Sequence, residues 1–168
     1  MVSTAPNPLD AQWPSSPRFR ARDGLEPVPT QPLPRPTTGK APSRHARPKV
    51  LVVEGDSGLR LIYRVNLEDA GLEVVEAADG PTGLELAKTA SPDLIVLEVM
   101  MAGLDGWQVA RRLRAEPATR AIPFIFVTPL SQYRQRGLAL GAVDYITLPC
   151  NPGRLVTRIR ELLTRTQG

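Results

Sequence analysis

The sequence contains very few of the residues on which disulfide-stabilised, metal-binding and many catalytic proteins depend. Its 168 residues include one cysteine, Cys150, and one histidine, His45. A single cysteine excludes an internal disulfide and a cysteine-based zinc site. Because His45 lies in a proline-rich segment, the rest of the chain has no histidine for a catalytic triad, a phosphohistidine or a metal cluster. We therefore expect a protein that is not an enzyme and that has no metal centre of these kinds.

Long apolar runs are also missing. No stretch of about eighteen apolar residues occurs, so we expect no transmembrane helix and no membrane partner. The N-terminus lacks the basic start and the apolar core of a secretory signal. These absences favour a cytoplasmic protein.

Charges of both signs are present, but they are distributed unevenly. Residues 1–49 carry eight Lys or Arg against three Asp or Glu. Residues 50–110 carry three against eleven, and residues 111–168 carry ten against three. The formal net charge of +4 therefore conceals an acidic half and an arginine-rich half in the part that we expect to fold.

The first part of the chain has an unusual composition. Residues 1–48 hold eleven of the eighteen prolines, and their apolar residues are isolated and show no period. Such a segment buries too little surface to offset chain entropy, so we predict that residues 1–47 are a disordered, basic, proline-rich tail. Trp13 and Phe19 could anchor a partner, although a solvated leader is the simpler interpretation. Residues 48–168 are then the folded domain.

Beyond this tail, short apolar segments alternate with segments of helical period. Apolar runs bounded by Gly, Pro or Asp predict strands, and apolar residues three to four positions apart predict helices. Strands that are apolar throughout are typical of a sheet covered by helices on both faces. Right-handed crossovers then give an α/β fold with a doubly wound, five-stranded parallel sheet. The strands are predicted at 49–54, 72–79, 92–98, 122–128 and 142–147, and the helices at 58–71, 80–91, 106–116, 130–141 and 151–166.

Three polar residues stand at the C-terminal ends of predicted strands: Glu54, Glu98 and Thr128. In doubly wound sheets the carboxyl ends of the strands line one crevice, and ligands bind there. We therefore expect these three side chains, although distant in sequence, to meet at one edge of the sheet.

Four segments carry a resemblance to a known family. VLVVEGDSGLR, PDLIVLEVMMAGLDGW, FVTPL and GAVDYITLP occur in that order along the chain. In order and spacing they resemble the receiver domain of bacterial two-component response regulators, from about Pro48 to Arg165. The resemblance implies a flavodoxin-like (βα)5 topology and a role in phosphorelay signal transduction.

The resemblance also implies roles for residues of the crevice. In the family, an aspartate at the position of Glu98 accepts a phosphoryl group. Two adjacent acids that hold Mg²⁺ correspond to Glu54 and Gly55, and Asp56 follows on the loop. The acceptor position and one acid position therefore depart from the usual residues.

Four further positions follow from the resemblance. A Ser or Thr that binds the phosphoryl group corresponds to Thr128, and an aromatic residue that reports the switch state corresponds to Tyr145. A lysine that pairs with the phosphoryl oxygens corresponds to Leu148, and the cis-proline after it corresponds to Pro149.

Each departure opposes phosphoryl transfer. Glutamate places its carboxylate about 1.5 Å further from the backbone, and a displacement of about 1 Å can slow in-line transfer about a hundredfold. Gly55 offers no oxygen to Mg²⁺, so we expect at best weak binding by Glu54, Asp56 and Glu98, and otherwise no cofactor. Leu148 cannot stabilise the transferring charge. We interpret Glu98 as a vestigial carboxylate rather than a permanent mimic of the phosphorylated state, since it has only about one negative charge.

Because little sequence follows the last predicted helix, we expect a stand-alone pseudo-receiver that acts by protein–protein interaction. In the family, the usual docking face is formed by the fourth helix, the fifth strand and the fifth helix. An arginine-rich face favours an acidic protein partner, and the sequence leaves open whether the domain also forms a homodimer. The arginines of this face are Arg134, Arg136, Arg154, Arg158 and Arg160.

Two alternative functions stay open. The first is a conventional phosphorelay receiver that is modified at the acceptor position. The second is a nucleic-acid-associated protein that uses its basic tail and arginine-rich helices, for which a steep salt dependence of binding would be the signature. No recognition helix or aromatic stacking motif supports it, so we expect nucleic acid to be an unlikely partner.

Removing residues 1–47 should leave the thermal unfolding midpoint nearly unchanged, because a disordered segment buries little apolar surface. The measurement is thermal unfolding followed by circular dichroism, for the full chain and the shortened one. A drop of many degrees would mean that Trp13 or Phe19 packs on the domain.

Overall fold

The computed structural model describes residues 46–165; the predicted tail with Trp13, Phe19 and His45 lies outside the described residues, apart from 46–47. Strands and helices alternate along this part of the chain, and all ten predicted elements are present within a few residues of their expected bounds. In chain order they are β1 (Lys49–Val53), α1 (Ser57–Asp69), β2 (Glu73–Ala77), α2 (Gly80–Thr89), β3 (Leu94–Leu97), α3 (Gly106–Ala115), β4 (Phe124–Thr128), η2 (Ser131–Tyr133), α4 (Arg134–Ala139), β5 (Asp144–Thr147) and α5 (Pro152–Arg165).

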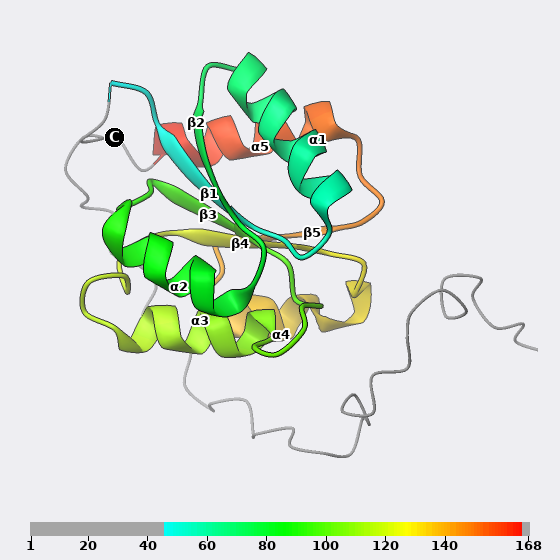
Figure 1. Cartoon of the computed structure of the whole chain (residues 1–168). Coiled ribbons are helices and arrows are strands. Elements are labelled where there is room, and N and C mark those ends of the chain that lie inside the picture. Colours follow the sequence, from blue (N-terminus) through cyan, green and yellow to red (C-terminus); the bar gives the residue numbers. More distant parts are fainter. Residues whose placement is uncertain (1–45, 166–168) are drawn as a thin grey trace, which may run out of the picture. The chain divides into compact units, whose positions relative to one another are not determined.

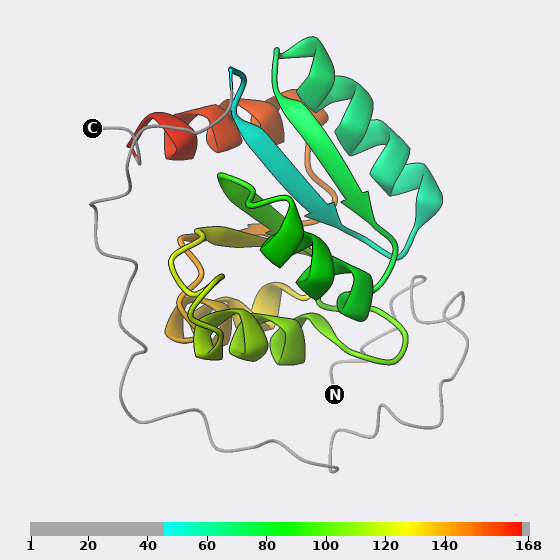
Figure 2. The same cartoon turned by 60° about the vertical axis from the view of Figure 1, so that its left-hand side comes forward.

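The five strands form one parallel sheet in the order β2-β1-β3-β4-β5. Helices α1 and α5 cover one face of the sheet, and α2, α3 and α4 cover the other, as Figures 1 and 2 show. The predicted doubly wound α/β fold is therefore confirmed. Its strands all end at the same edge, which is where the predicted crevice lies.

The core has two halves, and successive residues of each strand contribute to opposite halves. In β1, Leu51 and Val53 pack toward α2 and α3, whereas Val50 and Val52 pack toward α1 and α5. This alternation follows from the two-residue period of a strand. Because both faces are covered, all the residues of β3 and β4 are buried, which explains their unbroken apolar sequence.

Three helices begin at an aspartate on this edge of the sheet. Asp56, Asp79 and Asp105 each accept a hydrogen bond of 2.8 Å from a backbone N–H of the first turn of α1, α2 and α3. Such caps satisfy amide groups that the helix itself leaves unpaired. They also fix the loops that surround the crevice.

The fourth helix differs from its prediction. The segment 130–141 divides into a short 3₁₀ turn and a six-residue α4, and no side chain caps the start of α4. Gly137 lies within α4 because Tyr145 leaves no room for a side chain: an added Cβ would be 2.6 Å from a ring carbon of Tyr145. Packing against β5 therefore overrides the helical period of this segment.

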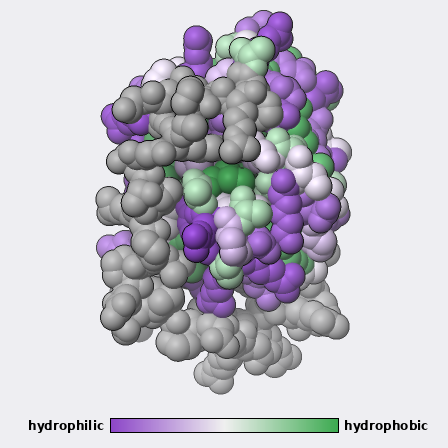
Figure 3. Space-filling model, turned by 90° about the vertical axis from the view of Figure 1, so that its left-hand side faces the viewer, coloured by the Kyte–Doolittle hydropathy of each residue, from purple (hydrophilic) through white to green (hydrophobic). Residues whose placement is uncertain are grey.

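The described surface is mainly polar. Seen from the side on which β1 begins, hydrophilic residues dominate, with a small apolar area near the centre (Figure 3). The large hydrophobic residues that are exposed include Leu61, Ile62 and Val65 on α1. None of the described helices is long and apolar enough to cross a membrane.

Replacing Gly106 with alanine should destabilise the domain. Gly106 opens α3, and an added Cβ would lie 2.7 Å from the Cα of Val99, directly after Glu98. We expect the Gly106→Ala variant to lose about 2–3 kcal/mol of unfolding free energy, because a clash with backbone is not relieved by a rotamer change. The measurement is urea unfolding.

Gly55→Ala is the matched control, because the nearest atom to an added Cβ is 3.9 Å away. Its unfolding free energy should change by less than about 0.5 kcal/mol. Equal losses in the two variants would contradict the packing described for Gly106.

Candidate functional site

The crevice at the carboxyl end of the sheet contains the three polar residues that the sequence places there. Glu54 follows β1, Glu98 follows β3 and Thr128 ends β4, which are neighbouring strands. The backbone N–H of Glu98 donates to the carbonyl of Val53 at 3.0 Å, which extends the ladder between β1 and β3. All three side chains are buried, with 4%, 5% and 0% of Glu54, Glu98 and Thr128 exposed. The fold therefore removes two carboxylates from water at one place.

Glu98 folds its side chain back onto the loop that follows it. Its Oε1 accepts hydrogen bonds from the backbone N–H of Val99 at 2.5 Å and of Met100 at 2.9 Å. Burial raises the pKa of Glu98, and the Thr128 side chain and these two amides oppose part of the rise. The buried hydroxyl of Thr128 makes no hydrogen bond among the described residues. The two backbone amides are therefore the hydrogen-bond donors that hold Glu98.

Glu54 is the more strongly perturbed acid. Its Oε1 accepts a hydrogen bond from the backbone N–H of Asp56 at 2.9 Å, whereas its Oε2 is buried without a partner among the described residues. Burial raises the pKa of Glu54 to about 7, and the nearby charges of Glu98 and Asp56 add to the rise. The two buried acids thus repel each other, and protonation of Glu54 relieves the repulsion.

Arg60 belongs to the site, although sequence reasoning did not identify it. From the first turns of α1, its Nη1 donates to the backbone carbonyls of Glu54 at 2.7 Å and of Gly55 at 3.0 Å. Its charge lowers the pKa of Glu54 slightly. The signal in the sequence is weak, because an arginine at an exposed helix position is common.

In the family that the sequence resembles, two acid positions bind Mg²⁺ and a third position carries a lysine. In this domain the corresponding residues lie in different environments. Gly55 is exposed and provides no side chain, and Asp56 is engaged as the cap of α1. Leu148 is partly buried and packs against the core on the α1 and α5 side, and its peptide bond to Pro149 is cis. Among residues 46–165, no group of three or more His, Cys, Asp or Glu side chains is placed to hold a metal ion.

Tyr145 points into the domain. It is 2% exposed, its hydroxyl donates to the carbonyl of Leu130, and its ring centroid lies 5.8 Å from that of Phe126. These contacts connect β5 to the β4–α4 loop that follows Thr128. The predicted pair of switch residues therefore lies on adjoining strands, with Tyr145 in an inward position.

The five arginines predicted as a docking face have unequal environments. Arg134 and Arg158 both contact Asp144, and the guanidinium carbon of Arg136 lies 4.8 Å from the centroid of the Trp107 ring. Arg154 and Arg160 are exposed, and no ion pair is recorded for either within the described part of the chain. The fold therefore engages three of the five arginines internally, and the docking role of the face stays a prediction.

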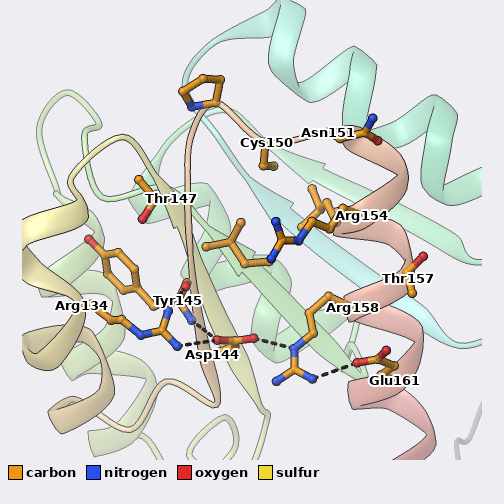
Figure 4. A pocket seen from close by; sticks show the side chains of 13 residues that line it. Arg134, Asp144, Tyr145, Thr147, Cys150, Asn151, Arg154, Thr157, Arg158 and Glu161 are labelled. Atoms are coloured by element: carbon orange, nitrogen blue, oxygen red, sulfur yellow. Dashed lines mark hydrogen bonds and ion pairs between the residues drawn. The ribbon is translucent and has the colours of Figure 1, made fainter.

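Arg134, Asp144, Arg154 and Arg158 line a groove of about 680 Å³ between α4 and α5. The close-up in Figure 4 shows Arg134 approaching Asp144 from one side and Arg158 from the other. Its lining also includes apolar residues: Ile146, Pro149 and Leu155. The groove thus lies on the predicted docking face, and its lining does not include the acids of the crevice.

The stability of the domain should fall as pH rises through neutrality. Because the folded-state pKa of Glu54 is raised to about 7 from 4.5, its stabilising contribution is complete below about pH 4.5 and is lost as pH rises through 7. Glu98 acts in the same direction. Glu54→Gln should remove on the order of 2 kcal/mol of this pH dependence between about pH 5 and pH 8.

Urea unfolding of the wild type and of Glu54→Gln at both pH values measures the effect. Glu85→Gln is the control, because Glu85 is an exposed acid on α2, away from the crevice. A pH dependence that persists unchanged in Glu54→Gln would show that this carboxyl is not buried as described.

The comparisons with known proteins agree with this geometry. The model of the response regulator receiver domain matches residues 50–160. The DNA-binding dual master transcriptional regulator RpaA of Synechocystis is 38% identical over 121 residues, which are 71% of this chain and 50% of that protein. The probable transcriptional regulator ycf27 of Cyanophora paradoxa is 43% identical over 122 residues, with the same coverage. The chain therefore spans about half the length of the curated relatives it matches.

A solved structure is similar in the same region. The receiver domain of the Francisella response regulator 1452 superposes with a TM-score of 0.67 at 32% identity, covering 71% of this chain and 99% of that domain. The matched proteins are thus named as regulators, and the overall fold is shared with a solved receiver. The chain belongs to the family of response regulator receiver domains.

Proposed function

We propose that this receiver domain acts in signal transduction by docking on a protein partner and does not depend on phosphorylation. The observation that carries the proposal is the conformation of Glu98. Its carboxylate is held by the amides of Val99 and Met100 instead of projecting freely into the crevice. A phosphoryl acceptor has to present an oxygen in line with the donor, and this carboxylate is turned back onto its own loop.

The surroundings of Glu98 support the same conclusion. Glu98 is 5% exposed, and burial raises its pKa. Leu148 packs into the core where the family has a cation, and Gly55 supplies no ligand to Mg²⁺. Neutralisation of the transferring charge is a large part of phosphoryl-transfer catalysis, and both usual sources of it are missing at these positions.

Docking is the output that we propose for the domain, and the groove between α4 and α5 is the surface that fits it. Exposed Arg154 and several apolar residues line this groove. Arginine pairs well with carboxylates, so an acidic protein is the partner that this chemistry favours. The charge distribution agrees, because residues 111–168 carry ten Lys or Arg against three Asp or Glu.

Nucleic-acid association is the second candidate. The Synechocystis relative is named as DNA-binding, which makes the sequence-based expectation of an unlikely nucleic-acid partner doubtful. That relative is about twice as long as the matched segment, so its name does not locate the DNA contact within the shared half. Binding through phosphate contacts would weaken steeply with salt, whereas docking of a protein would depend on salt less.

Incubation with a small phosphodonor and Mg²⁺ should leave the protein unmodified, because the acceptor, the metal ligand and the cation are all altered. Intact mass spectrometry is the measurement. A mass gain of about 80 Da located at Glu98 would overturn phosphorylation independence, since it is the mass of one phosphoryl group.

Two variants sharpen this experiment. Glu98→Asp alone should stay unmodified, because Gly55 and Leu148 are unchanged. The triple variant Glu98→Asp, Gly55→Asp, Leu148→Lys should gain the adduct, and the open space around Gly55 accommodates the new side chain. Modification of the single variant would show that the acceptor position alone decides the chemistry.

A further inference from the structure

Asp144 is a largely buried acid outside the crevice that makes contacts to two arginines and to the backbone. Its Oδ2 accepts from Nε of Arg158 at 2.6 Å, and its Oδ1 accepts from Nη2 of Arg134 at 3.3 Å and from the backbone N–H of Tyr145 at 2.7 Å. Only 13% of its side chain is exposed. One carboxylate of β5 thus connects a guanidinium of α4 with a guanidinium of α5 across the groove (Figure 4).

The same contacts occupy backbone groups of Tyr145 on the side of β5 that no other strand pairs with. β5 pairs only with β4, so its other edge has free hydrogen-bonding positions in principle. At Tyr145 the backbone N–H is bound by Asp144, and the backbone carbonyl accepts from Arg134. An added strand would have to displace both side chains. A partner at this groove must therefore be recognised mainly through its side chains.

We propose that Asp144 is an internal competitor for the partner, and that docking exchanges its ion pairs with Arg134 and Arg158 for ion pairs with carboxylates of an acidic protein segment. This inference rests on the proposed docking function and deepens it. The partner segment has an apolar residue for the apolar lining formed by Ile146 and Leu155, with acidic residues on either side. Arg154 makes the first contact, because no ion pair within residues 46–165 engages it.

The exchange follows from the geometry of the two arginines. Arg134 and Arg158 have 54% and 31% of their side chains exposed, whereas Asp144 has 13%. The arginines can therefore turn toward a ligand while Asp144 stays in place. A carboxylate from outside gains the two guanidinium groups only by weakening their bonds to Asp144. The internal ion pairs thus lower the affinity of the groove for any acidic segment. Tight binding then requires several contacts at the same time.

Asp144→Asn tests the proposal, because asparagine keeps an acceptor for the N–H of Tyr145 and loses the charge. The probe is a dye-labelled peptide of about nine residues, in which Asp and Glu surround one Leu and one Phe. Fluorescence anisotropy measures its affinity for the full chain. We expect Asp144→Asn to bind the peptide about threefold to tenfold more tightly, since each released exposed pair is worth up to about 1 kcal/mol.

Glu161→Gln is the matched control. Glu161 also lines the groove and contacts Nη1 of Arg158 at 2.9 Å, but it does not contact Arg134. Its removal changes the net charge by the same amount and should tighten binding by less than about twofold. In the Arg134→Gln, Arg158→Gln background, Asp144→Asn should have no effect, which is the result of a double-mutant cycle for a true exchange.

Several results would overturn the proposal. Equal gains in Asp144→Asn and Glu161→Gln would show an effect of net charge alone. An unchanged or weaker affinity in folded Asp144→Asn would show that the arginines are not released. An equal gain for a DNA duplex would assign the face to polyanions in general. If Asp144→Asn does not fold by circular dichroism, Asp144→Ser replaces it, because a hydroxyl also accepts from the N–H of Tyr145.

Arg154→Glu separates failure of this inference from failure of the docking function. If the peptide binds the wild type and Arg154→Glu weakens it, the docking face stands, and Asp144→Asn alone decides the exchange. If the peptide binds neither protein at about 0.15 M salt, the groove is not the docking face, and both proposals fail. The basic residues before Ala46 contribute equally to every variant, so differences between variants report on the groove.

Discussion

The burial of two carboxylates at the ends of adjacent strands is the constraint on which the rest of this site depends. A parallel sheet covered on both faces places Glu54 and Glu98 beside each other with almost no access to water. Buried charges are costly unless they are hydrogen-bonded or neutralised. The loops therefore supply backbone amides, from Asp56 to one acid and from Val99 and Met100 to the other. Those amides hold one oxygen of each carboxylate, Oε1, against the loop that follows it.

The same constraint explains why the replaced positions form a consistent set. A lysine at position 148 would reach toward the acids and favour their charged forms. Leu148 packs into the core instead, and the raised pKa values of both acids show that no nearby cation takes its place fully. Arg60 contacts the backbone carbonyls of this region rather than the carboxylates. The crevice thus takes part in the packing of the domain, and under the proposed function signalling comes from another surface.

The fold was predictable from sequence because its signals are local. Apolar strands and helical periods follow one another regularly, and the ends of the strands locate Glu54, Glu98 and Thr128 without any knowledge of tertiary contacts. The bounds of α4 were not predictable, because they depend on the contact of Gly137 with the ring of Tyr145. The contacts of Arg60 and Asp144 were not predictable either. Counting charges located the arginine-rich half correctly, but it could not show which arginines the fold already pairs.

Asp144 shows how one acid among many arginines can determine what a surface does. Without it, the face formed by α4 and α5 would carry a cluster of cations attractive to any polyanion. With it, two guanidinium groups are held apart at fixed positions, and their attraction to acids is reduced but not abolished. Lower affinity for isolated charges and higher dependence on correct spacing together favour specific recognition over general electrostatic binding. Under the proposed function, the domain signals through a basic groove whose selectivity is set by geometry, and not through chemistry at its acidic crevice.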